Sequence, residues 1–419
     1  MEAALYGPGG YYAERPSLGG AGADYFTAPE LHPAFGALLG RQVAQVWEAL
    51  GRPSRFDVVE HGPGSGALCR DLRLWAAHDA PDFAAAARYT LVERSTPLQE
   101  TQRATLAGAG LLDGRVGWEA PAPGGKGRYL GVILANELLD ALPVHLVAVR
   151  EGRLLERYVA PDETGPGLTF VEAAPSTRAL AAYFEALGLL PGEGCRAEVN
   201  LGAVAWAEQA AASLERGALL TLDYGYPAPE LYAPHRRHGT LLTYRGHALG
   251  SDPLVRIGEQ DITSHVDFTS IARAGERGGL ETLGLVDQAT FLHNLGLRQY
   301  LRLLEQAGQP AQDYDANRRA LLELASRDGL GAIKVLIQTR GLPGFQPTGL
   351  GPSKGPPYPP KIGEVGGAPP RAGQANSTGD PWLPLLHPGQ MRLPGPLEAE
   401  GFADLESQWH DFWTGEEEE

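Results

Sequence analysis

The chain has 419 residues, 43% of them hydrophobic, and a formal net charge of −16 at pH 7. This length is enough for two or three domains, and the acidic charge argues against a nucleic-acid partner. The two cysteines show neither the CxxC spacing nor the Cys/His clustering of a zinc site, so we expect neither a metal nor a disulfide.

The N-terminus lacks the basic and apolar regions of a secretory signal, and no stretch reaches eighteen continuous apolar residues. We therefore expect a cytoplasmic protein without membrane insertion, in a compartment that keeps thiols reduced. The sequence does not fix the oligomeric state, and an oligomer stays possible.

Residues 1–54 are predicted to form an N-terminal segment or lid, with glycine-rich turns before a helix at 34–50. From residue 55, short apolar runs alternate with helix-like segments, which is the pattern of a parallel α/β sheet. The predicted strands lie at 56–60, 89–93 and 128–136, and the helix-like segments at 67–78, 97–110 and 137–143. Runs such as 130–135 are apolar throughout, which indicates that both sheet faces are covered.

Residues 146–200 interrupt this alternation. We predict a hairpin at 146–160 around Glu151-Gly152, a helix near 177–187 and a strand at 196–200. The pattern resumes with a helix at 203–217 and a strand at 218–226, and a last core strand is expected at 332–338. The predicted core thus covers 55–338, with inserted substrate regions at about 144–200 and 226–330.

The character of the chain changes after residue 340. Residues 341–397 contain 14 Pro and 12 Gly, which predicts a disordered linker at 339–397. Within 398–419, five apolar residues fall on one helical face: Phe402, Leu405, Trp409, Phe412 and Trp413. We expect an amphipathic helix here, ending in the acidic run Glu416–Glu419, that docks on the core or binds a partner.

A glycine-rich turn follows the strand at 56–60. It contains Gly62, Gly64 and Gly66, preceded by Glu60. Glycines at a strand-to-helix turn let the backbone approach a ligand closely. The glycines alone do not choose the ligand, because Gly62, Gly64 and Ala67 also satisfy the dinucleotide spacing.

Two carboxylates favour S-adenosylmethionine (SAM) over a dinucleotide. Glu60 would oppose a pyrophosphate but suits the cationic amino-acid end of SAM. Glu93 ends the next strand about thirty residues after Gly62, later than the ribose acid of a dinucleotide site. This longer spacing suits the SAM-type sheet, in which the acid binds the ribose hydroxyls.

Several motifs occur in a specific order along residues 6–338. They are Gly10-Tyr11-Tyr12, Asp24–Glu30, Glu60–Gly66, Val92–Ser95, Ala135–Pro143, Asp223–Gly225, Asp261–Phe268, Phe291–Gly296 and Lys334–Leu336. In this respect the chain resembles the MidA-type family, whose mitochondrial members are complex I assembly factors and SAM-dependent protein arginine methyltransferases. The segment after residue 338 lies outside this resemblance.

The resemblance implies an α/β fold of the class I SAM-dependent methyltransferase type, Rossmann-like with a mostly parallel sheet. It implies an enzyme that transfers a methyl group from SAM to arginine, on a respiratory complex I-type subunit or another protein. The predicted cofactor-binding residues are Glu60, Gly62, Gly64, Gly66, Glu93, Asn136, Thr27 and Pro29.

A guanidinium acceptor needs carboxylates to orient its planar fork and to balance its charge. Glu137 is our first candidate and Asp140 the second, since both follow the strand at 128–136. His265 and Asp267 are the next candidates. The structural alternatives are helix capping for Asn136 and Asp140, a hydrogen-bonded loop for His265 and Asp267, and a turn for Asp223.

Three other functions remain open from the sequence. The first is a SAM methyltransferase that acts on lysine, a small molecule or RNA. The second is an assembly chaperone that binds SAM without catalysis, and the third is a nicotinamide enzyme. Binding of SAM rather than NAD would exclude the third.

Overall fold

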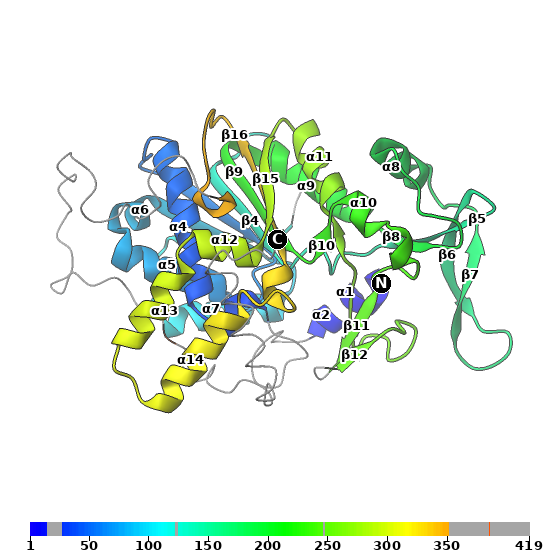
Figure 1. Ribbon diagram of the computed structural model, residues 1–419, viewed down its shortest axis with the longest axis horizontal. Coiled ribbons are helices and arrows are strands. Elements are labelled where there is room, and N and C mark those ends of the chain that lie inside the picture. Colours follow the sequence, from blue (N-terminus) through cyan, green and yellow to red (C-terminus); the bar gives the residue numbers. More distant parts are fainter. Residues whose placement is uncertain (15–26, 122–124, 246–247, 352–384, 386–419) are drawn as a thin grey trace, which may run out of the picture.

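The computed structural model describes residues 1–14, 27–121, 125–245 and 248–351, together with residue 385 (Figure 1). The predicted helix and tail at 398–419, residues 352–384 and 386–397 of the predicted linker and the start of the Asp24–Glu30 motif lie outside these residues. The prediction of a disordered linker is wrong for 339–351, because this stretch holds the end of a strand and a 3-10 turn and buries Leu342. No described helix has both the length and the hydropathy to cross a membrane. Likewise, the described His, Cys, Asp and Glu side chains form no group of three that could hold a metal ion.

Seven strands form the central sheet, in the order β15-β16-β9-β4-β1-β2-β3. Their bounds are β1 Phe56–His61, β2 Ala87–Val92, β3 Val116–Glu119, β4 Tyr129–Asn136, β9 Leu214–Asp223, β15 Glu281–Asp287 and β16 Lys334–Arg340. The five strands from β9 to β3 run parallel, whereas β16 is antiparallel to both of its neighbours. The predicted mostly parallel sheet is therefore confirmed.

Two layers of helices cover this sheet (Figure 1). The first layer holds α4 Ala34–Ala49, α5 Ala67–Asp79, α6 Pro81–Ala86, α7 Thr96–Gly108, α12 Gln288–Asn294, α13 Leu297–Gln306 and α14 Ala311–Glu323; the second holds α9 Leu201–Ser213 and α11 Phe268–Arg277. On β1, Val58 packs into the first layer and its neighbour Val59 into the second. Coverage of both faces explains why a run such as 130–135 of β4 is apolar throughout.

A second sheet is inserted between β4 and α9. Its order is β7-β6-β5-β8, with bounds β5 His145–Arg150, β6 Arg153–Pro161, β7 Leu168–Ala173 and β8 Arg196–Val199. The predicted hairpin turn is confirmed: Glu151 and Gly152 both have positive φ, 53° and 69°, as a two-residue type I′ turn requires. Helix α8 (Ala179–Leu187) packs on one face of this sheet.

The segment from 225 to 267 forms small elements beside the second sheet. They are β10 Gly225–Tyr226, α10 Ala228–Leu231, the 3-10 turn η1 Pro234–Arg236, β11 Leu242–Arg245, β12 Ala248–Gly250, β13 Asp261–Thr263 and β14 Val266–Asp267. From α11 onward the chain returns to the central layers, because β15 pairs with β16 at the edge of the main sheet. The predicted insertion at 226–330 is therefore too long, and only its first part lies outside those layers.

The N-terminal residues contact both the central sheet and these small elements. They form three short helices, α1 Glu2–Tyr6, α2 Tyr11–Glu14 and α3 Ala28–Leu31. The Tyr6 hydroxyl donates to the Ala141 carbonyl (2.9 Å), and the Tyr12 hydroxyl donates to Asp261 Oδ1 (2.8 Å). The described part of the N-terminal segment is thus fixed against the carboxyl end of the sheet.

Candidate active site

A cavity of about 890 Å³ lies at the carboxyl ends of β1, β2 and β4. This edge is where open α/β sheets bind their ligands. The cavity is lined by eight of the predicted site residues: Thr27, Pro29, Glu60, Gly62, Gly64, Glu93, Asn136 and Glu137. Gly66 is not among the lining residues and serves instead as the N-cap residue of α5.

The glycine turn has the backbone that its sequence predicts. Gly62, Gly64 and Gly66 have φ values of +66°, +52° and +81°, in the left-handed region that favours glycine. At Gly62 a Cβ would lie 2.8 Å from Leu138 Cδ1, so the Leu138 side chain would have to shift. The Gln102 amide donates to the Gly64 carbonyl (2.9 Å) and so holds the turn in place.

Glu60 presents a buried carboxylate to the cavity. Its Oε2 atom is buried and has no hydrogen-bond partner among the described residues. Burial raises the pKa of Glu60 to about 8. A buried carboxylate oxygen without a donor is costly unless a ligand supplies one. The ammonium group of SAM has the matching chemistry, three donors and a positive charge.

Glu93 follows the last residue of β2 and is held on both carboxylate oxygens. Oε1 accepts from the Ser95 N–H (2.7 Å) and Oε2 from the Gln102 amide (3.4 Å). Burial raises its pKa despite these donors. Each oxygen has a second lone pair, so the fixed carboxylate can still accept hydrogen bonds from the two hydroxyls of a ribose.

Asn136 and Glu137 form the wall of the cavity beyond β4. Glu137 Oε1 accepts from the Ala28 N–H (3.1 Å) and from the Asn136 amide (3.0 Å). Glu137 also has φ +49°, an unusual backbone conformation for a residue with a side chain and one that concentrates at functional sites. Burial raises the pKa of Glu137 to about 8. The structure thus fixes one oxygen of a carboxylate that lines the cavity.

The segment 137–143, predicted to be helix-like, forms no helix. Asp223 at the end of β9 explains this difference. Its Oδ2 accepts from the backbone N–H groups of Leu138, Leu139 and Asp140, at 3.1, 2.7 and 3.4 Å. A carboxylate more than eighty residues away therefore holds three successive backbone N–H groups of this segment in a non-helical turn.

Asp140, predicted as a second acceptor-binding residue, does not line the cavity. Its carboxyl group is buried close to Asp223 and Asp261, and burial followed by these two charges raises its pKa. Asp140 therefore lies behind the wall that Glu137 forms.

His265 and Asp267, also predicted as catalytic, lie outside this cavity. Both carboxylate oxygens of Asp267 have structural partners: Oδ1 accepts from the Thr269 N–H (2.9 Å), and Oδ2 from the hydroxyls of Tyr183 (2.6 Å) and Ser270 (2.7 Å). The prediction that Asp267 acts in catalysis therefore conflicts with its position as the N-cap of α11. His265 lines a different cavity, beside the second sheet.

We expect Asp267→Ala to lower the free energy of unfolding by about 2–4 kcal/mol, because it removes a helix cap and the buried carboxylate that accepts from the Tyr183 and Ser270 hydroxyls. Urea denaturation measures this loss. Binding of SAM by the folded fraction is expected to stay within about threefold of the wild type, since Asp267 is remote from the cavity. An Asp267→Ala variant that has wild-type stability but no longer binds SAM would contradict the structural role of Asp267.

Several cavity residues were not predicted from the sequence. Tyr6 and Tyr12 line it from the N-terminus, and Trp206 lines it from α9. The Trp206 indole N–H donates to His61 Nδ1 (3.2 Å), and burial lowers the pKa of His61 to about 4. His61 is therefore a neutral acceptor at pH 7. Tyr12 lies in a quoted motif, but Trp206 carries no local signal, because an apolar helix position looks the same whether it faces a core or a ligand.

The two raised carboxyl pKa values predict the pH dependence of the ligand-free protein. Glu60 and Glu137 have folded-state pKa values of about 8, against 4.5 ordinarily. The fold favours the protonated forms of both groups. Their contribution to the free energy of unfolding is therefore fully present below pH 4.5 and is lost as the pH rises to about 8. Urea denaturation of the wild type and of E60Q/E137Q over pH 5–8.5 measures the difference. A wild type that gains stability relative to the variant as pH rises would contradict this pH dependence.

Comparison with known proteins agrees with this geometry. A family model described as "Putative S-adenosyl-L-methionine-dependent methyltransferase" matches residues 38–286. The chain is 32% identical over 325 residues to mouse protein arginine methyltransferase NDUFAF7, mitochondrial, covering 72% of this chain and 71% of that protein. It is 30% identical over 334 residues to the human protein of the same name, covering 72% and 70%.

A solved structure extends the likeness to three dimensions. A protein from Burkholderia thailandensis, crystallised with S-adenosyl-homocysteine, has 35% sequence identity and a TM-score of 0.75. The match covers 83% of this chain and 88% of that one. A native crystal structure from the same organism gives a TM-score of 0.72 at the same identity.

Proposed function

The chain belongs to the family of SAM-dependent methyltransferases that includes the NDUFAF7 proteins, and we propose that it methylates arginine side chains of a protein substrate. Methyl transfer from SAM is common to the family. Arginine as the acceptor is supported by the names of the relatives and by one feature of the site.

That feature is the Glu137 carboxylate. It lines the cavity, it is fixed at Oε1 by Ala28 and Asn136, and its backbone is held at φ +49°. No hydrogen bond holds Oε2 among the described residues, so this oxygen can accept from a guanidinium N–H. A charged, fixed acceptor suits the planar fork of arginine, which donates in fixed directions.

Bound SAM would supply a methyl group already activated by the sulfonium. The chain's own residues then have to position two reactants and exclude water. Glu60 would hold the cationic amino-acid end and Glu93 the ribose, while the turn at Gly62–Gly66 lets the backbone lie close to the cofactor. Glu137 would orient the acceptor guanidinium and, once ionised, balance its charge.

The protein substrate is the least defined part of this proposal. By resemblance, a subunit of the respiratory complex I type is the first candidate, and other proteins follow. The relatives are named as mitochondrial, and for this chain a cytoplasmic location stays a prediction from the sequence.

The test is to incubate the protein with SAM labelled in the methyl group and with lysate of the host organism. Mass spectrometry then identifies the labelled protein and the labelled residue. The expected result is methylarginine, absent when an E60Q variant replaces the wild type. A label on lysine, on RNA or on a small molecule would overturn arginine specificity. Tight SAM binding without any transfer would favour the assembly-chaperone alternative.

A further inference from the structure

The second sheet has one face that α8 does not cover. In the strand register, Leu146 lies opposite Arg157 on β6 and opposite Glu198 on β8, and Ala148 lies opposite Arg196 on β8. Residues that lie opposite one another point to the same face of the sheet, so Arg157, Arg196 and Glu198 share one face. Val147 and Val199, on the opposite face, pack with α8. The open face therefore carries arginines where the covered face carries valines.

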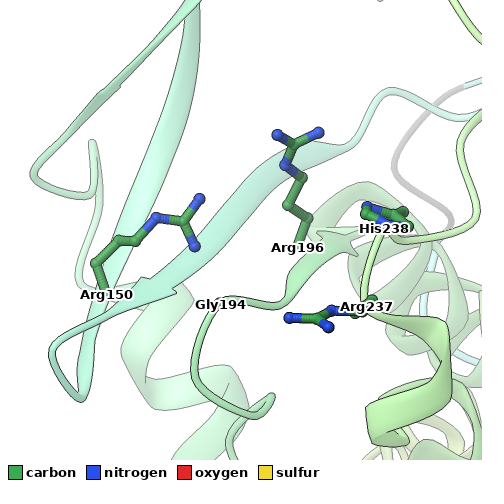
Figure 2. Close-up of a pocket in the computed structure, with 5 residues that line it drawn as sticks. All are labelled: Arg150, Gly194, Arg196, Arg237 and His238. Atoms are coloured by element: carbon green, nitrogen blue, oxygen red, sulfur yellow. The ribbon is translucent and has the colours of Figure 1, made fainter.

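These arginines meet at a small cavity. Arg150, Arg196, Arg237 and His238 line about 310 Å³ together with Gly194. Figure 2 shows Arg150 and Arg237 extending toward each other from the two sides of the cavity, with Arg196 rising from β8 between them. An adjoining cavity of about 770 Å³ continues along the sheet past Arg157 and Phe170.

Most of this positive charge has no acidic partner. Arg150 pairs with Glu172 (2.7 Å), but Arg157, Arg196 and Arg237 have no ion pair among the described residues. Glu198 accepts from the Thr240 N–H (2.8 Å) and Asp252 from the Leu254 N–H (2.9 Å), while Glu172 and Glu198 attract Arg157 without forming an ion pair with it.

Apolar side chains share the face with the arginines. Arg157 lies over the Phe170 ring, 4.3 Å from its centroid. Val159 and Leu168 are 53% and 40% exposed on the same side of the sheet. We use "arginine face" for the set Arg150, Arg157, Arg196, Arg237, Val159, Leu168 and Phe170. It is both cationic and apolar, in a chain whose net charge is −16.

We propose that the arginine face binds the C-terminal segment 398–419 of the same chain. This segment has nine acidic residues and neither lysine nor arginine. Its apolar residues are Phe402, Leu405, Trp409, Phe412 and Trp413, so it combines the two properties that complement the face. The interaction is independent of the methyl-transfer proposal, because no cavity residue of the SAM site takes part in it.

Chain length permits this contact. Residues 352–397 lie between the last described element, η3 (Thr348–Leu350), and the segment. An extended chain of that length spans on the order of 150 Å, far more than the width of a domain of this size. Tethering also keeps the segment at a high effective concentration near the face, so weak charge contacts are enough for occupancy.

Hydrogen exchange of the full-length protein, followed by mass spectrometry, tests the proposal. In the wild type, amides of 402–415 are expected to exchange about tenfold more slowly than in R196E/R237E, which corresponds to about 90% occupancy. Both arginines are exposed and lack an ion pair, so their reversal is expected to leave the fold intact. The matched control is R302E/R319E, two exposed arginines on α13 and α14, which lie at the other end of the molecule (Figure 1).

Two further variants separate binding from misfolding. E416Q/E417Q/E418Q/E419Q changes only the segment and is expected to speed its exchange as well. Adding E416K/E417K/E418K/E419K to R196E/R237E is expected to restore slow exchange, because the charges are swapped. Equal exchange of 402–415 in the wild type and R196E/R237E would overturn the proposal. Protection that disappears on dilution would also overturn it, since the segment would then lie on a second copy.

Discussion

Glu60→Gln is expected to weaken SAM binding by about 100-fold or more. The Glu60 carboxylate has a buried oxygen without a partner among the described residues, and it offers the charge that the ammonium of SAM requires. Glutamine keeps the shape but removes the charge and adds donors that oppose those of the ligand. Isothermal titration calorimetry at pH 8 measures the change. The wild-type affinity should itself increase from pH 6 to 8, as Glu60 ionises.

The same substitution should stabilise the ligand-free protein. A carboxyl group whose pKa is raised to about 8 by burial opposes folding when it ionises, and glutamine does not ionise. We expect a gain on the order of 1–3 kcal/mol at pH 8 without SAM. Glu100→Gln, an exposed change on α7, serves as the control and should alter neither property. Unchanged SAM affinity in Glu60→Gln would remove Glu60 from the site.

Glu137→Gln is expected to lower the rate of methyl transfer to arginine by about 1000-fold while SAM affinity changes by less than about threefold. Glutamine can retain the hydrogen bonds to Ala28 and Asn136 through its oxygen. It loses the negative charge that orients and balances a guanidinium. Single-turnover transfer of labelled methyl groups measures the rate, and calorimetry measures SAM binding in the same preparation.

Asp140→Asn provides the comparison for Glu137→Gln. Asp140 lies behind the cavity wall, and burial with two neighbouring carboxylates raises its pKa, so the neutral amide resembles its preferred form. We expect transfer within about tenfold of the wild type. The opposite result, an active Glu137→Gln and an inactive Asp140→Asn, would reverse the order of the two candidates.

The cofactor half of the site could be predicted from the sequence because its signals are local. Glu60, Gly62, Gly64 and Glu93 all stand at strand ends, and a strand end fixes where the next side chains lie. The positive φ at the three glycines is one that glycine adopts more readily than other residues. No information from distant parts of the chain was needed for this half.

The acceptor half depends on contacts between distant residues. The helix-like segment 137–143 is held as a turn by hydrogen bonds to Asp223, which comes from a strand more than eighty residues later. The sequence makes Asp267 a catalytic candidate because it lies two residues after His265. In the structure its carboxylate accepts hydrogen bonds from the hydroxyls of Tyr183 and Ser270. The arginine face could not be predicted from the sequence either, because its four arginines are far apart along the chain, at positions 150, 157, 196 and 237.

The closure of the cavity by the N-terminus has a consequence for protein synthesis. Tyr6 bonds to Ala141, 135 residues later, and Tyr12 bonds to Asp261, 249 residues later. Tyr6 and Tyr12 therefore leave the ribosome well before the residues that complete their contacts. Such long-range closure is slow, and SAM cannot stabilise the nascent chain through a complete site until residue 261 has emerged.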